Sequence, residues 1–155
     1  MAVAGVRATR AGRRRFPVRP TDRRADRCHD QGVSRRSVLV VDDDPDFRRL
    51  AAQVLTGWGH IVLAEAGGVA DALAEAARTR PDVAIVDIGL PDGDGFDLTV
   101  RLRAMPSPPQ VVLVSSDSSA GNAVTARRVG ARGFVAKVDL SEDRLRRLVD
   151  PGWRA

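Results

Sequence analysis

The chain has 155 residues, enough for one domain of ordinary size with some residues to spare. Hydrophobic residues make up 43% and charged residues 29%, which is typical of a globular protein and does not fit disorder throughout. No apolar run approaches the roughly 20 residues that a membrane-spanning helix needs, so no membrane partner is expected. The single cysteine, Cys28, excludes an internal disulfide framework and favours a reducing, cytoplasmic setting.

The net charge of +5 is concentrated at the start of the chain. Residues 1–36 carry 11 Arg and 3 Asp, whereas the remaining residues have a net charge of −3. This segment lacks apolar periodicity, so we interpret it as a basic, disordered arm. Translation that starts near Val33 is an alternative explanation. An arm that tethers nucleic acid through phosphate contacts is a less favoured hypothesis, because no aromatic residues are interleaved with the arginines.

Two short patterns within the arm invite a functional interpretation, and both are rejected. Arg13-Arg14-Arg15-Phe16 resembles part of a twin-arginine export signal, but no apolar segment follows it. Cys28 and His29 are adjacent residues without a second ligand pair, which is poor geometry for zinc.

From Ser37 onward, short apolar strands alternate with amphipathic helices. The β-branched run of residues 38–41 predicts a strand that is buried on both faces. The acidic residues and Pro45 that follow it predict a capped helix start. A helical apolar stripe then runs from Phe47 to Leu55 and ends at Gly57.

The same unit repeats four more times along the chain. The other predicted strands cover residues 61–63, 83–86, 111–114 and 133–136, and the other predicted helices cover residues 69–76, 94–104, 119–129 and a short segment capped by Ser141. Five strands that alternate with five helices predict a parallel sheet covered on both faces. The predicted fold class is therefore α/β, a (βα)5 three-layer sandwich over residues 37–150, with a short tail at residues 151–155.

Polar side chains stand where four of the five predicted strands end. Asp42 and Asp43 follow the first strand, Asp87 the third, Ser115 the fourth and Lys137 the fifth. Ligands of α/β proteins bind at the carboxyl ends of the strands. Each residue alone has a structural explanation as a helix cap, a turn residue or a solvated charge. Their coincidence at one edge of the sheet favours a site.

The chemistry of this cluster favours a metal ion and a phosphate. Three packed carboxylates repel one another unless a cation neutralises them, and Mg²⁺ prefers such oxygen ligands. A carboxylate in this setting can attack phosphorus and form an aspartyl phosphate. Lys137, the single lysine among 25 cationic residues, and the Ser115 hydroxyl would then contact the phosphoryl oxygens.

Four motifs in this order resemble the receiver domain of bacterial two-component response regulators, over roughly three quarters of the chain. The motifs are the acidic pair within residues 40–45, the Asp, Leu-Pro and Gly pattern of residues 87–95, the segment 114–116, and the segment 130–137, which ends in Lys137. The resemblance implies a CheY-like domain with the flavodoxin-like strand order 2-1-3-4-5.

The resemblance also implies a role for each acidic residue. Asp87 would be the phosphorylated aspartate. Asp43 would bind Mg²⁺ directly and Asp42 would help through water, while Asp87 and the Gly89 carbonyl would complete the protein ligands.

The remaining site residues would contact or sense the phosphoryl group. Ser115 and Lys137 would contact it, and Phe134 would be the ring that turns inward when Ser115 shifts. The chain departs from the family pattern at Val138, where the family usually has a proline with a cis bond.

The favoured hypothesis is a single-domain response regulator that takes a phosphoryl group from a histidine kinase or a histidine phosphotransfer protein. It would require Mg²⁺ and would switch a face that docks an unknown downstream protein. It would not be an ordinary enzyme, because it would catalyse only its own phosphorylation and dephosphorylation. We expect a monomer or weak dimer without a DNA-binding output domain.

Two alternatives belong to other functional classes. The first is a scaffold with a receiver fold that binds partners without phosphorylation. The second is a metal-dependent phosphatase with a carboxylate nucleophile, which the absence of a cap domain in 155 residues disfavours.

Overall fold

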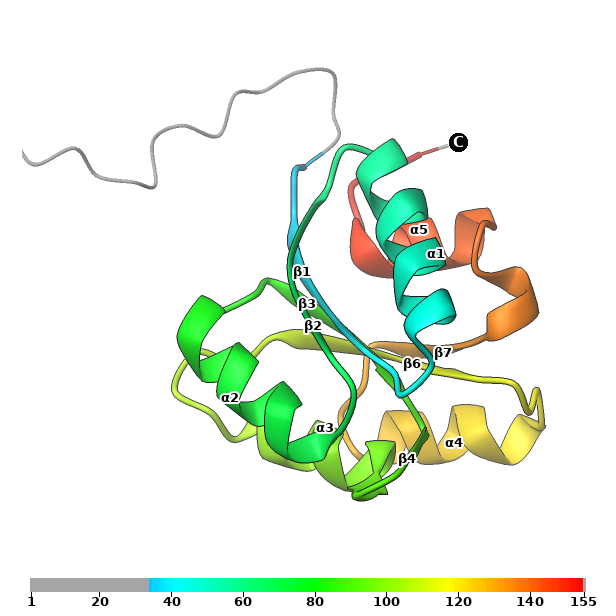
Figure 1. Cartoon of the computed structure of the whole chain (residues 1–155). Coiled ribbons are helices and arrows are strands. Elements are labelled where there is room, and N and C mark those ends of the chain that lie inside the picture. The colour runs from blue at the N-terminus through cyan, green and yellow to red at the C-terminus, as the bar shows by residue number, and fades with distance from the viewer. Residues whose placement is uncertain (1–33, 155) are drawn as a thin grey trace, which may run out of the picture.

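The computed structural model describes residues 34–154, and these residues form one three-layer α/β domain (Figure 1). The interpretations of the basic arm, of Cys28 and of His29 lie outside the described residues.

A five-stranded parallel sheet forms the middle layer. Its spatial order is β2-β1-β3-β6-β7, which confirms the predicted 2-1-3-4-5 order of the five main strands. The strands are β1 (Ser37–Val41), β2 (Ile61–Ala66), β3 (Val83–Asp87), β6 (Gln110–Ser115) and β7 (Gly133–Ala136). All four neighbouring pairs are parallel, so the carboxyl ends of the strands meet at one edge of the sheet.

Helices cover both faces of this sheet. Helices α1 (Pro45–Gly57) and α5 (Asp143–Val149) lie on one face, and α2 (Val69–Thr79), α3 (Gly95–Arg103) and α4 (Ala120–Arg128) lie on the other (Figure 1). Alternate residues of β1 point into the two cores: Val38 and Val40 pack on the α1 and α5 side, whereas Leu39 and Val41 pack on the α2 to α4 side. The apolar run 38–41 is therefore continuous because both of its faces are buried, as predicted.

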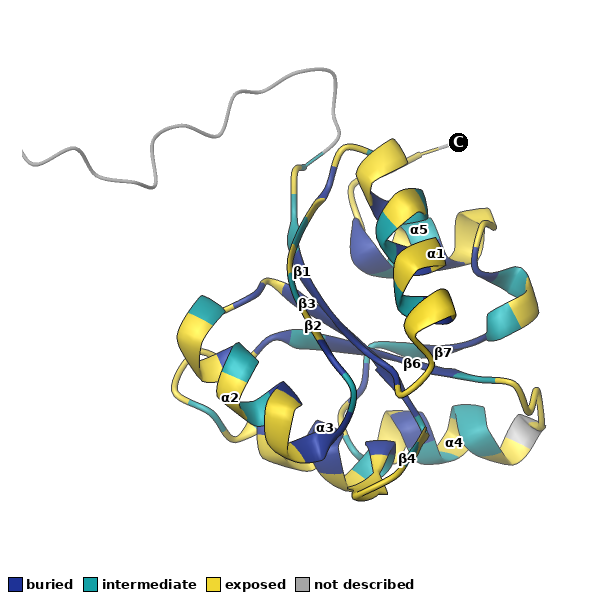
Figure 2. Cartoon of the chain, in the orientation of Figure 1, coloured by how far each residue is buried: buried dark blue, intermediate teal, exposed yellow. Residues whose placement is uncertain are grey.

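The central strands are buried and the β2 edge is partly exposed (Figure 2). Every residue of β3 is buried, whereas β2 alternates between exposed and partly buried residues until Ala66. The central strands β1 and β3 therefore cannot move without disturbing both cores, and this fixes the position of their carboxyl ends.

Of two helix starts predicted from local sequence signals, the start of α1 is confirmed and that of α5 is not. Asp44 is the N-cap of α1, its side chain accepts a hydrogen bond from the Asp46 N–H at 2.9 Å, and Pro45 is the first helical residue. The predicted cap of α5 is wrong, since Glu142 and not Ser141 is its N-cap. A turn closed by the hydrogen bond from the Glu142 N–H to the Asp139 carbonyl delays the helix start by one residue.

Two further features were not predicted. Strands β4 (Gly89–Leu90) and β5 (Gly93–Asp94) form a short antiparallel hairpin between β3 and α3. After β7, the single-turn helix η1 (Lys137–Asp139) carries an exposed Val138, and residues 34–154 contain no cis peptide bond. No helix in this part of the chain is long and apolar enough to cross a membrane.

Candidate metal centre

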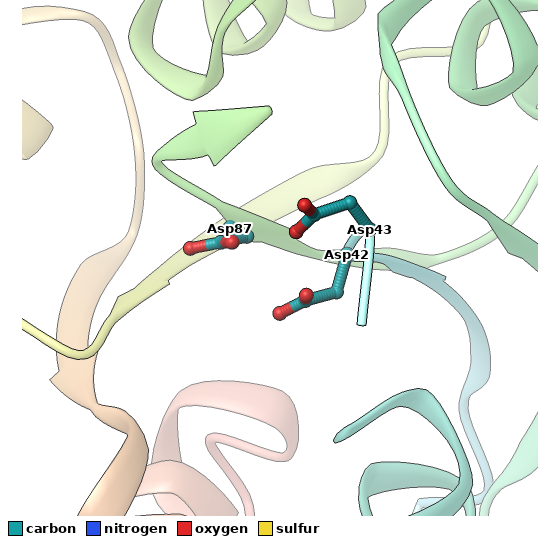
Figure 3. Close-up of side chains that lie close together, drawn as sticks. All are labelled: Asp42, Asp43 and Asp87. Atoms are coloured by element: carbon teal, nitrogen blue, oxygen red, sulfur yellow. The ribbon is translucent and has the colours of Figure 1, made fainter. Parts of the chain in front are cut away.

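Three carboxylates converge at the carboxyl edge of the sheet, as the sequence predicted. Asp42 and Asp43 follow β1, and Asp87 is the last residue of β3. Because Val41 of β1 pairs with Val86 of β3, the two strand ends lie side by side. One oxygen atom from each carboxylate lies within 4.8 Å of the others, and the three side chains gather in one place (Figure 3).

Burial differs sharply among the three carboxylates. Asp42 is 0% and Asp87 7% exposed, whereas Asp43 is exposed to solvent. Burial raises the pKa of Asp87, and the nearby charge of Asp42 raises it further, whereas the Lys137 ammonium and the Gly89 N–H act in the opposite direction. Asp87 is thus a nearly buried carboxylate whose pKa lies above that of an exposed aspartate.

Lys137 supplies the cation of this cluster. Its Nζ lies 2.6 Å from Asp42 Oδ2 and 3.3 Å from Asp87 Oδ2, and it stands 4.5 Å from the centre of the Phe47 ring. Burial acts to lower the pKa of Lys137, but the two carboxylates outweigh it and raise the pKa overall. The charged Lys137 side chain therefore lies against two carboxylates and the face of an aromatic ring.

Ser115 and Phe134 stand apart from these contacts. Ser115 ends β6 next to Val114, the register partner of Asp87, and its hydroxyl accepts a hydrogen bond from the Asp117 N–H at 3.0 Å. Phe134 is buried in the core on the α2 to α4 side. The structure therefore brings Asp42, Asp43, Asp87 and Lys137 together, and it places Ser115 at the same edge of the sheet without joining it to them.

Sequence reasoning missed two residues that border the site. Phe47 was assigned only to the helix core, although its ring also faces the Lys137 ammonium. Its place in the first turn of a helix that starts at the strand ends was the available signal. The second residue is Asp92, whose contact with α2 spans 23 residues and leaves no local pattern.

The donor set fits a hard divalent cation. Carboxylate oxygens are the ligands that Mg²⁺ prefers, and the exposed Gly89 in β4 offers a carbonyl nearby in the chain. Asp42 Oδ2 is buried and lies 2.6 Å from the Lys137 ammonium, the one cation in contact with this carboxylate among the described residues. Three carboxylates with a single ammonium leave an excess of negative charge, which a divalent cation would neutralise.

Comparison with known proteins agrees with this geometry. The model of the response regulator receiver domain family matches residues 38–150. The chain is 38% identical to the transcriptional regulatory protein PrrA of Mycobacterium leprae over 108 residues, which are 70% of this chain and 46% of PrrA. It is 40% identical to the transcriptional regulatory protein KdpE of Mycobacterium tuberculosis over 100 residues, which are 64% of this chain and 43% of KdpE.

Solved structures show the same fold. The signal receiver domain of the putative response regulator NarL from Mycobacterium tuberculosis is 29% identical, with a TM-score of 0.65 over 74% of this chain and 96% of that one. The chemotaxis response regulator CheY4 of Vibrio cholerae is 26% identical, with a TM-score of 0.66 over 74% of this chain and 99% of that one.

The fold and the matched residues define a CheY-like receiver domain. The chain belongs to the response regulator receiver family. It spans about half the length of the curated relatives PrrA and KdpE.

Proposed function

We propose that this protein is a phosphate-accepting signalling domain in which Asp87 receives a phosphoryl group from a histidine kinase or a histidine phosphotransfer protein. Asp42, Asp43, Asp87 and the Gly89 carbonyl would hold Mg²⁺. The observation that carries the proposal is the convergence of three carboxylates within 4.8 Å, with Lys137 against two of them.

The transfer forms one bond and breaks one. A carboxylate oxygen of Asp87 attacks phosphorus and forms an acyl phosphate, the P–N bond to the donor histidine breaks, and the imidazole nitrogen keeps the electron pair. Because burial and Asp42 raise the pKa of Asp87, its ionised oxygen is more basic than that of an exposed aspartate. The protein contributes position and charge to this step.

Lys137 and Ser115 would stabilise the transferred group. The Lys137 ammonium already lies 3.3 Å from Asp87 Oδ2, so a short movement brings it to a phosphoryl oxygen bound there. The Ser115 hydroxyl at the same sheet edge accepts a hydrogen bond from the Asp117 N–H, and its own O–H proton would donate to a phosphoryl oxygen. Mg²⁺, when bound, supplies further positive charge to the same oxygens.

The signal would leave through a change of surface shape that involves Phe134. Its ring borders a shallow depression of about 240 Å³ between the start of α4 and α5, whose lining also includes Ser119 and Arg144. A rotation of this ring would therefore alter a surface that a downstream protein can contact. We propose residues 37–150 as the working domain, a separate protein as its target, a monomer or weak dimer, and the cytoplasm as the site of action.

The test is the intact mass after incubation with Mg²⁺ and acetyl phosphate. We expect one added phosphoryl group on the wild type and none after chelation of the metal. Asp87→Asn should lose the adduct, whereas Asp97→Asn, which removes an exposed carboxylate from α3, should keep it. A folded wild type that takes up no phosphoryl group would support the phosphorylation-independent scaffold instead.

A further inference from the structure

The base of the β4–β5 hairpin is fixed to the sheet. The Ile88 N–H donates to the Val114 carbonyl at 3.0 Å, and the Gly95 N–H donates to the Ile88 carbonyl at 2.8 Å. A Cβ on Gly95 would lie only 2.3 Å from the Asp87 carbonyl oxygen, so α3 starts directly against the backbone of the proposed phosphoacceptor. The chain is thereby fixed at Ile88, just before the hairpin, and at Gly95, just after it.

The tip of the hairpin is fixed to a different element. Asp92 lies in its two-residue turn, and the Asp92 carboxylate accepts hydrogen bonds from the Val69 N–H at 2.6 Å and the Ala70 N–H at 3.1 Å. These two amides open α2, whose own N-cap residue, Gly68, has no side chain to offer. Helix α2 is therefore capped from the loop that follows the proposed phosphoacceptor.

Two glycines allow this close approach. A Cβ on Gly68 would lie 2.6 Å from Asp92 Oδ1, and a Cβ on Gly93 would lie 2.9 Å from Val69 Cγ2. A side chain at either glycine would push the hairpin tip away from α2. The contact is thus built by small residues on both partners as well as by the carboxylate.

We propose that Asp92 is a positioning residue that holds the hairpin tip on α2 and so places the Gly89 carbonyl at the metal centre. This inference rests on the proposed function, in which that carbonyl is a metal ligand. Gly89 pairs with Asp94 and Leu90 pairs with Gly93, and no further residue pair belongs to this hairpin. A ladder of two residue pairs is not stable alone, so its tip must be anchored for the carbonyl to keep its place.

The test is the affinity of the metal-free protein for Mg²⁺, measured by isothermal titration calorimetry. Asp92→Ala should weaken Mg²⁺ binding about tenfold, the size expected when a group that orients a ligand is removed. Gly68→Ala should weaken it comparably without any change of charge, because the added methyl group collides with Asp92 Oδ1.

Asp94→Asn is the matched control. It removes one negative charge from the same hairpin, where Asp94 caps only its own helix α3 through the Phe96 N–H at 2.6 Å. We expect the affinity of this variant to stay within about twofold of the wild type, since general loss of charge at an exposed position is screened. Asp92→Asn, which keeps one acceptor oxygen, should fall between Asp92→Ala and the wild type.

The outcomes separate this inference from the proposed function. If the folded wild type binds Mg²⁺ but Asp92→Ala and Gly68→Ala bind it equally well, the positioning role is wrong and the metal centre stands. Equal weakening in Asp92→Ala and Asp94→Asn would likewise overturn it in favour of a charge effect. If the wild type binds no Mg²⁺, both the inference and the proposed metal centre fail. Should Asp92→Ala not fold, Asp92→Asn and Gly68→Ala carry the same test.

Discussion

The two ends of the parallel sheet satisfy buried carboxylates in opposite ways. At the carboxyl end, Asp42 and Asp87 lie close to each other and share the ammonium of Lys137. At the amino end, Asp150 is 1% exposed and accepts hydrogen bonds from the N–H groups of Ser34 and Gly152, both at 3.1 Å. The first pair is left with like-charge repulsion, whereas the lone carboxylate is matched by backbone donors.

The amino end is closed by contacts within the chain. The Arg36 N–H donates to His60 Nδ1 at 3.2 Å, and the Arg146 guanidinium lies 4.5 Å from the ring centre of Trp153 and 5.6 Å from that of Trp58. The Arg36 contact joins the start of β1 to the residue before β2, and the Arg146 contacts join α5 to the tail and to the end of α1. Burial of an aspartate is therefore no sign of function by itself; what distinguishes the site is a buried carboxylate whose partners leave charge uncompensated.

The largest expected effect is at the closed end. Asp150→Ala removes the acceptor of two partly buried N–H groups, so we expect the free energy of unfolding to fall by about 1–3 kcal/mol. Urea unfolding followed by circular dichroism measures it. Asp150→Asn, which keeps one acceptor oxygen, should lose less, and the folded variants should accept a phosphoryl group as the wild type does. A loss below about 0.5 kcal/mol, the range of ordinary surface substitutions, would break the contrast between the two ends.

At the carboxyl end of the sheet, which we call the open end, the change in the free energy of unfolding is expected to have the opposite sign. Because burial and Asp42 raise the pKa of Asp87, ionised Asp87 opposes folding at neutral pH, and Asp87→Asn should leave the metal-free protein equally stable or up to about 1 kcal/mol more stable. Mg²⁺ should reverse the order, since a concentration ten times the dissociation constant stabilises the wild type by about 1.4 kcal/mol. Urea unfolding with and without Mg²⁺ tests both statements. A marked destabilisation of Asp87→Asn without metal would show that Asp87 is a structural acid like Asp150.

The open end was predictable from the sequence because its residues occupy positions that strand patterns locate. The apolar run of residues 38–41 marks where β1 ends, so the pattern alone is enough to place Asp42 and Asp43 at the sheet edge. Asp87 and Lys137 follow equally clear strands. A parallel sheet then brings these ends together without further information, which is why the carboxylate cluster was predicted residue by residue.

The closed end and the hairpin contact were not predictable because they depend on long-range placement. The Asp150 carboxylate meets the Ser34 N–H across 116 residues, and Asp92 meets α2 across 23. In both pairs a side chain bonds to backbone, and every residue type except proline offers the same N–H, so no sequence pattern marks the partner. The misplaced α5 cap has a related cause, because a turn that ends at Glu142 set the helix start.

The smallest expected effect concerns the pH dependence of the closed end. Burial lowers the pKa of His60; Asp150 opposes this shift, and Arg146 and Arg36 add to it. The folded state therefore binds fewer protons than the unfolded chain at pH values below about 6.5, the ordinary pKa of histidine. Since stability rises with pH wherever the unfolded state binds more protons, the free energy of unfolding should fall as the pH drops from 7.5 through 6.5.

His60→Asn isolates this contribution. An Asn Oδ1 atom can accept the Arg36 N–H in place of His60 Nδ1, but it does not take up a proton in this range. Urea unfolding at pH 7.5 and 5.5 should therefore show a smaller loss of stability in the variant than in the wild type. The other histidine, His29, is present in both proteins and cancels in the comparison. Because the protonated imidazole has no lone pair on Nδ1, protonation of His60 must break the contact with the Arg36 N–H. Equal losses would therefore mean that residue 60 makes no contribution to the pH dependence of stability.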